Sequence, residues 1–155
     1  LSKNGIHHFE LSTNDVTPYN LSFRSGIYKF YTVLHAGINP HSANLWDYGM
    51  GFGSYHTIKN KASIDFEGTT HTLQPLDRTI DGFNMDLRFK IRFGYRFTKY
   101  LEVIGGPILH YYWLDVQNAE DELFADRFGK NAFSSSHFGD VLSKSWIGFE
   151  LAVRY

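Results

Sequence analysis

The sequence predicts an all-β fold, an antiparallel transmembrane up-and-down β-barrel, for which we expect eight strands. Residues 87–97 alternate between apolar side chains and charged or small ones, which is the period of a strand because successive side chains leave a pleat on opposite sides. Residues 101–113 also place apolar side chains at every second position. Both segments have about the length of a tilted strand that crosses a bilayer. Aromatic residues are abundant, with 14 Phe, 10 Tyr and 3 Trp.

Composition limits the class of protein. The 155 residues suit one domain, 1–155, and 15 basic against 16 acidic residues give no reason to expect a nucleic-acid partner. Because cysteine is absent, neither a disulfide nor a thiolate metal site can form. No apolar run reaches the roughly 18 residues of a membrane helix. Barrel strands do not need such a run, since alternation hides their apolar half.

The first half of the chain predicts one weak strand and three longer ones. Residues 8–12 alternate only briefly, and 14–20 has the composition of a turn. We expect one continuous strand over 21–38, with Phe30 and Leu34 on its even-numbered face. The alternation here does not decide which of the two faces points outward. In the strand 46–58, large apolar residues alternate with Asp47, Gly49, Gly51 and Gly53. Glycines on one face are costly in a strand, so we expect bulky neighbours or a bend there. A tight turn at Asn60 and Lys61 leads to the strand 62–72.

The second half contains the hairpin 87–97 and 101–113 and a closing strand, 145–155. A loop is expected over 73–82, and a long one over 115–144, where 119–128 has the spacing of one or two helical turns. Long loops thus alternate with short turns, an asymmetry typical of membrane barrels. Seven strands are counted where an even number is expected. An eighth strand could precede Leu1 or be hidden in a loop, or the chain could be the C-terminal part of a larger barrel.

The last ten residues carry a family resemblance. The segment 146–155 resembles the closing strand of bacterial outer-membrane β-barrel proteins, whose assembly signal has a glycine, alternating hydrophobic residues and a terminal aromatic. Gly148, Leu151, Val153 and Tyr155 match those positions. The aromatic-rich alternation is similar to small barrels of the OmpA and OmpX type or of Bacteroidota. The resemblance implies a location in the bacterial outer membrane, contact with its lipid and insertion by the outer-membrane assembly machinery.

Charged residues alternate with the apolar ones and should fill the barrel. If the apolar face meets lipid, an internal network of ion pairs is expected, because buried charges are normally paired. A lining that binds anions is the functional alternative. The residues 98–100 form a turn that places Arg96 opposite Glu102, the pair expected first. The predicted network consists of Arg88, Lys90, Arg92, Arg96, Glu102, Glu150, Asp65 and Glu67.

Catalytic and metal chemistry have weak support in the sequence. The eight histidines show no compact ligand spacing, so neither a metal site nor a cofactor is expected. A lipid-modifying enzyme resembling lipid A deacylases stays open as an alternative, with His41, Ser42 and Asn44 in one loop and His110 expected across the barrel from Glu150. A Ser–His–acid site is defined by geometry, which a sequence cannot supply. We therefore assign no catalytic residue.

Alternation alone does not say which face of the sheet is outside. A soluble lipocalin-like barrel would turn its apolar face inward around a ligand. In the membrane interpretation, aromatic side chains near the strand ends form interfacial girdles. These aromatic residues are Trp46, Tyr48, Tyr111, Trp113, Tyr155 and Tyr28.

The expected role is structural or in surface interactions, without an open pore, and the chain could be a subunit of a larger envelope complex. The long loop 115–144 is the expected contact with an envelope protein partner, because recognition concentrates on loops held by a rigid scaffold. Its phenylalanines, Phe124, Phe128, Phe133 and Phe138, could form that surface or fold back as a lid. The strand 145–155 should pair with both 100–113 and the first strand, which would leave no open edge in lipid.

Overall fold

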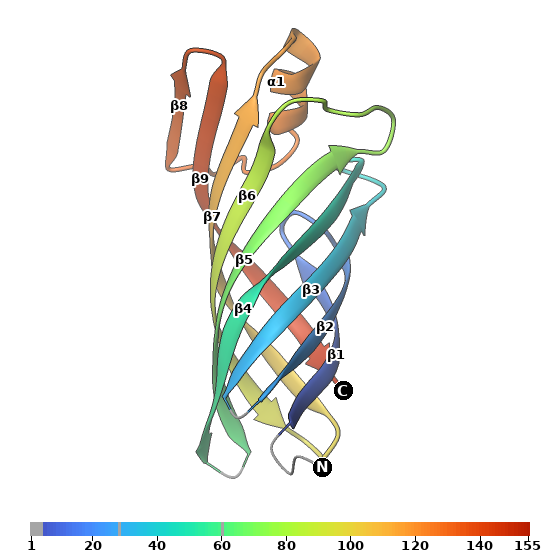
Figure 1. The fold of residues 1–155 in the computed structure, drawn as a ribbon, viewed down its shortest axis with the longest axis vertical. Helices are drawn as coiled ribbons and strands as arrows, with labels where there is room; N and C mark the ends of the chain where they lie inside the picture. Colours follow the sequence, from blue (N-terminus) through green and yellow to red (C-terminus); the bar gives the residue numbers. More distant parts are fainter. Residues whose placement is uncertain (1–4, 28, 60) are drawn as a thin grey trace.

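The computed structural model describes residues 5–27, 29–59 and 61–155 as an antiparallel sheet of nine strands, eight of which close into a ring (Figure 1). The ring runs from β1 to β7 in chain order, and β9 lies between β7 and β1. The elements are β1 (Gly5–Asn14), β2 (Tyr19–Ile27), β3 (Phe30–Asn39), β4 (Leu45–Lys59), β5 (Ala62–Pro75), β6 (Asn84–Arg96), β7 (Glu102–Asp115), α1 (Ala119–Ala125), β8 (Ser134–Phe138) and β9 (Val141–Arg154).

The expected single strand over 21–38 is wrong, because this segment is a hairpin. Ile27 pairs with Phe30 across the turn, so odd residues of β2 oppose even residues of β3. Accordingly Leu21 and Phe23 point outward from β2, whereas Phe30 and Leu34 point outward from β3. The segment that was expected to form one strand of the ring therefore supplies two, β2 and β3. The eighth strand of the ring comes from this segment and not from a loop or from residues before Leu1. Tyr28 lies outside the described residues.

Two further boundaries differ from the expectation. The first strand is ten residues long rather than the short one expected over 8–12, and β1 pairs with both β2 and β9. The segment 115–144 is less irregular than expected, because it contains α1, β8 and the first residues of β9. The helical turns expected within 119–128 are confirmed by α1, where the Asn118 side chain caps the helix by accepting from the backbone N–H groups of Glu120 and Asp121.

The two ends of the ring differ in their connections. At the turn end, short connections join β2 to β3, β4 to β5 and β6 to β7; Asn60, in the expected turn of the second, lies outside the described residues. At the loop end, residues 15–18 and 40–44 make two short connections, whereas the connections from β5 to β6 and from β7 to β9 are longer, and the last one includes α1 and β8 (Figure 1). Phe97 N–H donates to Leu101 O at 2.9 Å, and Arg96 is paired with Glu102, which confirms the register expected for this turn.

The ring closes where β9 meets β1. Leu11 pairs with Val153, and Phe9 exchanges two backbone hydrogen bonds with Tyr155, at 3.0 and 2.8 Å. On its other side β9 pairs with β7 along its whole length, so the expected double pairing of the closing strand is confirmed. The short strand β8 pairs with the first residues of β9, beyond the end of β1. Among the helices of the described part, none is long and apolar enough to cross a membrane.

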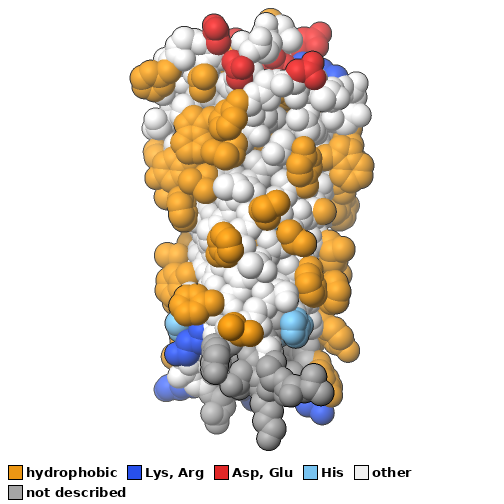
Figure 2. All heavy atoms as spheres, viewed as in Figure 1, with side chains coloured by type: hydrophobic (Ala, Val, Ile, Leu, Met, Phe, Trp, Pro, Cys, Tyr) orange, Lys and Arg blue, Asp and Glu red, His pale blue; other side chains and the backbone are white. Residues whose placement is uncertain are grey.

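The two faces of the wall have opposite chemistry. Large apolar side chains point outward, for example Phe52 at 73% exposure and Phe30 at 71%. Charged side chains point inward and are buried. The interior is narrow: Tyr31 occupies the space that a side chain at position 53 would need, and this explains why β4 carries Gly53 opposite it. Figure 2 shows the outward apolar side chains over the wall, acidic side chains at the loop end and Lys and Arg at the turn end.

Candidate functional site

A network of ion pairs fills the middle of the ring interior. Its centre is Arg92, a fully buried residue of β6. Its Nη1 lies 2.8 Å from Glu10 Oε1 and 2.7 Å from Glu150 Oε1, while Nη2 lies 2.9 Å from Asp65 Oδ2 and 3.1 Å from Glu67 Oε2. One guanidinium thus holds carboxylates from β1, β9 and β5 together across the ring, which links strands that are far apart in the sequence.

Three other cations complete this network. Lys90 Nζ lies 3.1 Å from Glu67 and 3.0 Å from Glu150, and Arg24 Nη1 lies 2.9 Å from Glu10. Arg154 contacts Glu10 at 3.0 Å and also Asp65. The four cations Arg24, Lys90, Arg92 and Arg154 therefore face four carboxylates, Glu10, Asp65, Glu67 and Glu150. Such a balanced set satisfies the requirement that buried charges be paired.

Seven of the eight predicted interior residues are buried, and the eighth is placed differently. Arg96 is half-buried, and its Nη2 donates to the Tyr55 hydroxyl at 2.7 Å. That hydroxyl donates in turn to Glu102 Oε1 at 3.1 Å, so Tyr55 bridges the pair that was expected to be in direct contact. The prediction that Arg96 lies opposite Glu102 in the sheet is therefore confirmed, and the prediction of a direct ion pair between them is wrong. Glu102 is instead 3.6 Å from Arg154.

The sequence analysis missed Glu10, Arg24 and Arg154 as members of the network. Arg154 and Glu150 share one face of the closing strand, and this alternation could have revealed Arg154. Arg24 was hidden by the hairpin that was interpreted as one strand. Within β2, the polar Ser22 and Arg24 alternate with Leu21 and Phe23, and that short pattern was the available signal.

A second polar layer lies between this network and the loop end. Arg88 is its only arginine or lysine among the described residues, with Nε 2.6 Å from Asp86 and Nη1 2.8 Å from Asp47. Next to Asp47 lie His35 and His71: His71 Nδ1 is 2.7 Å from Asp47 Oδ1, and His35 Nε2 is 3.5 Å from Asp47 Oδ2. We call the three residues His35, Asp47 and His71 the histidine cluster. They are the described group of His and acidic residues whose geometry could hold a metal ion.

His110 belongs to the same layer but lies on the side of Asp86. Its Nδ1 is 2.9 Å from Asp86 Oδ2, and its ring stacks on Trp146 with centroids 4.4 Å apart. Trp146 Nε1 donates to Asp15 at 2.7 Å. The expected position of His110 across from Glu150 is not matched by a contact, because Glu150 bonds with Lys90 and Arg92 instead.

An apolar cap closes the loop end of the interior. Phe124 lies in α1 and Phe128 follows the helix. Their ring centroids are 5.4 Å apart, and Phe128 also contacts Tyr112 and Trp146. Two of the four phenylalanines of the segment 115–144 thus form a lid, while Phe133 and Phe138 are exposed. The cap consists of Val16, Ala43, Leu45, Leu73, Ile80, Tyr112, Leu114, Phe124, Ala125, Phe128, Leu142 and Trp146.

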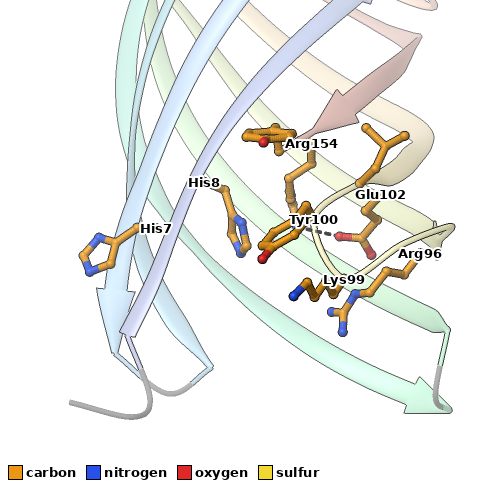
Figure 3. Close-up of a pocket in the computed structure, with 9 residues that line it drawn as sticks. His7, His8, Arg96, Lys99, Tyr100, Glu102 and Arg154 are labelled. Atoms are coloured by element: carbon orange, nitrogen blue, oxygen red, sulfur yellow. Dashed lines mark ion pairs between the residues drawn. The ribbon is translucent and has the colours of Figure 1, made fainter. Parts of the chain in front are cut away.

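A pocket of about 280 Å³ opens at the turn end (Figure 3). Arg96, Lys99 and Arg154 line it together with Glu102, and His8 points toward it while His7 points away. Lys99 Nζ lies over the Tyr100 ring at 4.6 Å. Among the described residues, Arg154 and Glu102 belong to both the pocket lining and the ion-pair contacts, so the pocket adjoins the network.

The residues considered for hydrolysis do not assemble into a catalytic arrangement. His41 is exposed, and Ser42 bonds with Asn39. A serine, a histidine and an acid do meet elsewhere, where Ser22 Oγ lies 2.9 Å from His35 Nδ1 beside Asp47. Ser22 is 2% exposed, so a substrate has no access to its hydroxyl. Because a nucleophile must contact its substrate, this buried serine cannot act as one in the structure described.

Comparisons with protein-family models, with curated proteins and with solved structures found no match to this chain.

Proposed function

We propose that the chain is a transmembrane β-barrel of the bacterial outer membrane, with a structural or surface-interaction role and no enzymatic activity. The observation that supports this most is the inverted polarity of the wall, where outward side chains are apolar and inward ones are charged and paired. Water-soluble proteins rarely expose apolar patches larger than a few hundred Å². A lipocalin-like ligand-binding barrel would have the opposite arrangement, with an apolar interior, so this alternative has no support from the burial pattern.

The shape of the wall agrees with this proposal. Eight antiparallel strands in a closed ring leave no strand edge along the wall, and an open edge in hydrocarbon would cost several kcal/mol for each unpaired backbone group. Trp46 and Tyr48 near one end and Tyr155 at the other are exposed, as interfacial girdles require. Tyr111 and Trp113 are half-buried and stack on each other, with centroids 6.3 Å apart.

The barrel has no role as an open pore. The ion pairs around Arg92 and the apolar cap fill the interior at successive levels. Eight-stranded barrels have an interior just wide enough for side chains. The charged lining therefore stabilises the wall, and we do not assign it the transport of anions.

We place the loop end outside the cell and the turn end in the periplasm, because outer-membrane barrels have long extracellular loops and short periplasmic turns. The outer end carries a surface for an envelope protein partner. Leu123, Phe133 and Phe138 are 65%, 63% and 76% exposed there, beyond the ring and next to acidic residues of α1. Aromatic and aliphatic side chains in a polar surround are typical centres of protein interfaces.

Cell fractionation tests the proposed location. We expect the protein in the outer-membrane fraction, resistant to extraction at alkaline pH, and with a folded form that migrates differently from the boiled form in gel electrophoresis. Recovery in the soluble fraction in a folded state would overturn the proposal.

A pull-down from envelope extracts tests the proposed surface. The triple substitution Leu123→Ser, Phe133→Ser and Phe138→Ser should abolish retention of the partner and leave the barrel assembled, because these side chains are outside the apolar cap. The matched control is Asn131→Ser with His137→Ser, two exposed polar residues of the same segment. Equal retention by both variants would remove this surface from consideration.

A further inference from the structure

We infer that the histidine cluster is a binding site for a divalent transition-metal ion, of which Zn²⁺ is the natural probe. Its three residues come from three neighbouring strands, His35 from β3, Asp47 from β4 and His71 from β5. Imidazole nitrogen and carboxylate oxygen are the ligand atoms that such ions prefer, and three protein ligands suffice when a further position stays open. One ligand atom from each residue lies within 4.8 Å of the others.

The backbone places the two imidazoles next to each other across a glycine, with the edge of one ring toward the other. In the sheet register, Gly49 of β4 pairs with His35 on one side and with His71 on the other. A side chain at position 49 would overlap the ring of His71, its Cβ lying 2.7 Å from Cγ and 2.8 Å from Nδ1. The glycine therefore leaves the space in which the rings approach to 4.7 Å, directly next to Asp47 two residues along β4.

Both rings are held through the nitrogen that faces away from the cluster. His35 Nδ1 lies 2.9 Å from Ser22 Oγ, and His71 Nε2 lies 2.8 Å from Thr69 Oγ1. Metal-bound histidines characteristically donate their second ring N–H to such a partner, which fixes the ring and turns the lone pair of the other nitrogen to the metal. Here that arrangement directs His35 Nε2 and His71 Nδ1 at Asp47.

One ligand atom has nothing else to bind. His35 Nε2 is buried and has no hydrogen-bond partner among the residues that the structure describes. Its 3.5 Å separation from Asp47 Oδ2 is longer than an ordinary hydrogen bond, so the lone pair of this nitrogen points at the carboxylate of Asp47 and is free for an ion.

The charges of this layer leave room for a cation. Asp47 and Asp86 are fully buried carboxylates, and Arg88 between them is the only arginine or lysine that contacts either in the described chain. His110 contacts Asp86 on the side away from the histidine cluster, so Arg88 and His110 both face Asp86, whereas Asp47 has only its share of Arg88. Arg88 contacts Asp47 through Oδ2, so Oδ1 is the oxygen that we assign to the ion, and the ion replaces the 2.7 Å contact between Oδ1 and His71 Nδ1. Since the apolar cap covers this layer, loading takes place as the protein folds.

Refolding of the untagged chain in detergent, with Co²⁺ or Zn²⁺ or with a chelator, tests the site. We expect one ion per chain to survive gel filtration and the visible spectrum of Co²⁺ to show nitrogen and oxygen ligands at low coordination number. His35→Gln with His71→Gln should abolish retention, and Ser22→Ala should weaken binding about 10- to 100-fold because it frees the ring of His35. His41→Gln, an exposed histidine, is the control and should retain the ion.

Circular dichroism of each variant in chelator separates lost binding from lost folding. The assignment is overturned if the folded wild-type chain retains no ion, since the cluster is then a hydrogen-bonded His–Asp group only. It is equally overturned if the folded double variant retains as much ion as the wild type. If the double variant does not fold, Asp47→Asn and Ser22→Ala supply the same comparison.

Discussion

The middle of the ring interior and the apolar cap fill adjoining spaces with opposite chemistry. Around Arg92 the contacts are ion pairs, which the buried hydroxyl of Tyr31 joins by donating to Glu67, while large apolar side chains of β6 such as Phe89, Ile91 and Phe93 point outward. In the cap, Phe124 and Phe128 point inward while Glu120 and Glu122 of the same segment are exposed. The cap therefore has the polarity of a water-soluble protein, and the wall has the reverse.

The change of polarity occurs at a common level in several strands. Along β4 the inward residues change from Leu45 to Asp47, and along β5 from Leu73 to His71. Along β7 they change from Tyr112 to His110. Our proposal accounts for this reversal by two media, because a wall in lipid must place its polar groups inside and a loop region in water must place its apolar groups inside. The level of the change marks the outer boundary of the membrane in our proposal.

The largest effect is expected from removal of the central cation. Arg92→Ala leaves carboxylates from three strands without their common partner, and the loss of one member of a buried pair costs about 3–5 kcal/mol. Denaturant unfolding in detergent or lipid vesicles measures it. Arg96→Ala, on the same strand, is the control and should cost about 1 kcal/mol, because a hydrogen bond to Tyr55 is lost. Equal losses would show that the network is not the core of the wall.

A comparable but local effect is expected in the cap. Phe124→Ala removes a fully buried ring, at a cost of about 3–5 kcal/mol. The loss should open the loop end to protease while the ring stays folded, because the cap is a separate packing unit. Limited proteolysis of the reconstituted protein measures this. Leu123→Ala, next to it and exposed, should change stability by less than about 0.5 kcal/mol. Unfolding of the ring together with the cap would contradict the division between the two regions.

A charge on the outer face identifies the medium around the wall. Ile91 points outward near the middle of β6, paired with Phe66 of β5. Ile91→Arg should cost about 2–4 kcal/mol in a bilayer, whereas Phe97→Arg at the turn end should cost about 0–1 kcal/mol. Unfolding in vesicles gives both values. If the two substitutions are equally mild, the wall is not in hydrocarbon.

The smallest direct effect on folding is expected at the C-terminal residue. Tyr155→Asp places a charge at the proposed boundary of the membrane, where the folding cost is about 0–1 kcal/mol. Any large loss in cells would then be attributed to failed recognition of the assembly signal that we propose, in which Gly148, Leu151 and Val153 are the other residues. The measurement compares assembled protein in cells with refolding in detergent. Normal amounts in both would count against the signal.

The sequence by itself determined the strand character of most of the wall and the side to which many residues point. Alternation is a local property, because it depends only on the pleat, and it identified Arg88, Lys90, Arg92 and Glu150 as one class of interior residue. The same local rule failed at 21–38. The outward face changes from odd residues such as Phe23 to even residues such as Phe30, and in the sequence such a change is hard to distinguish from an irregular strand.

Only the tertiary structure decided which residues meet across the interior. Arg92 contacts residues 82 and 58 positions away in the chain, Glu10 and Glu150, and no periodicity encodes such a distance. The histidine cluster shows the same limit. Its residues have no ligand spacing along the chain, and they converge because two strand pairings place His35 and His71 on either side of Gly49. Backbone hydrogen bonding between neighbouring strands thus brings the histidine cluster together, and the closure of the ring between β9 and β1 brings Glu10 and Glu150 to Arg92.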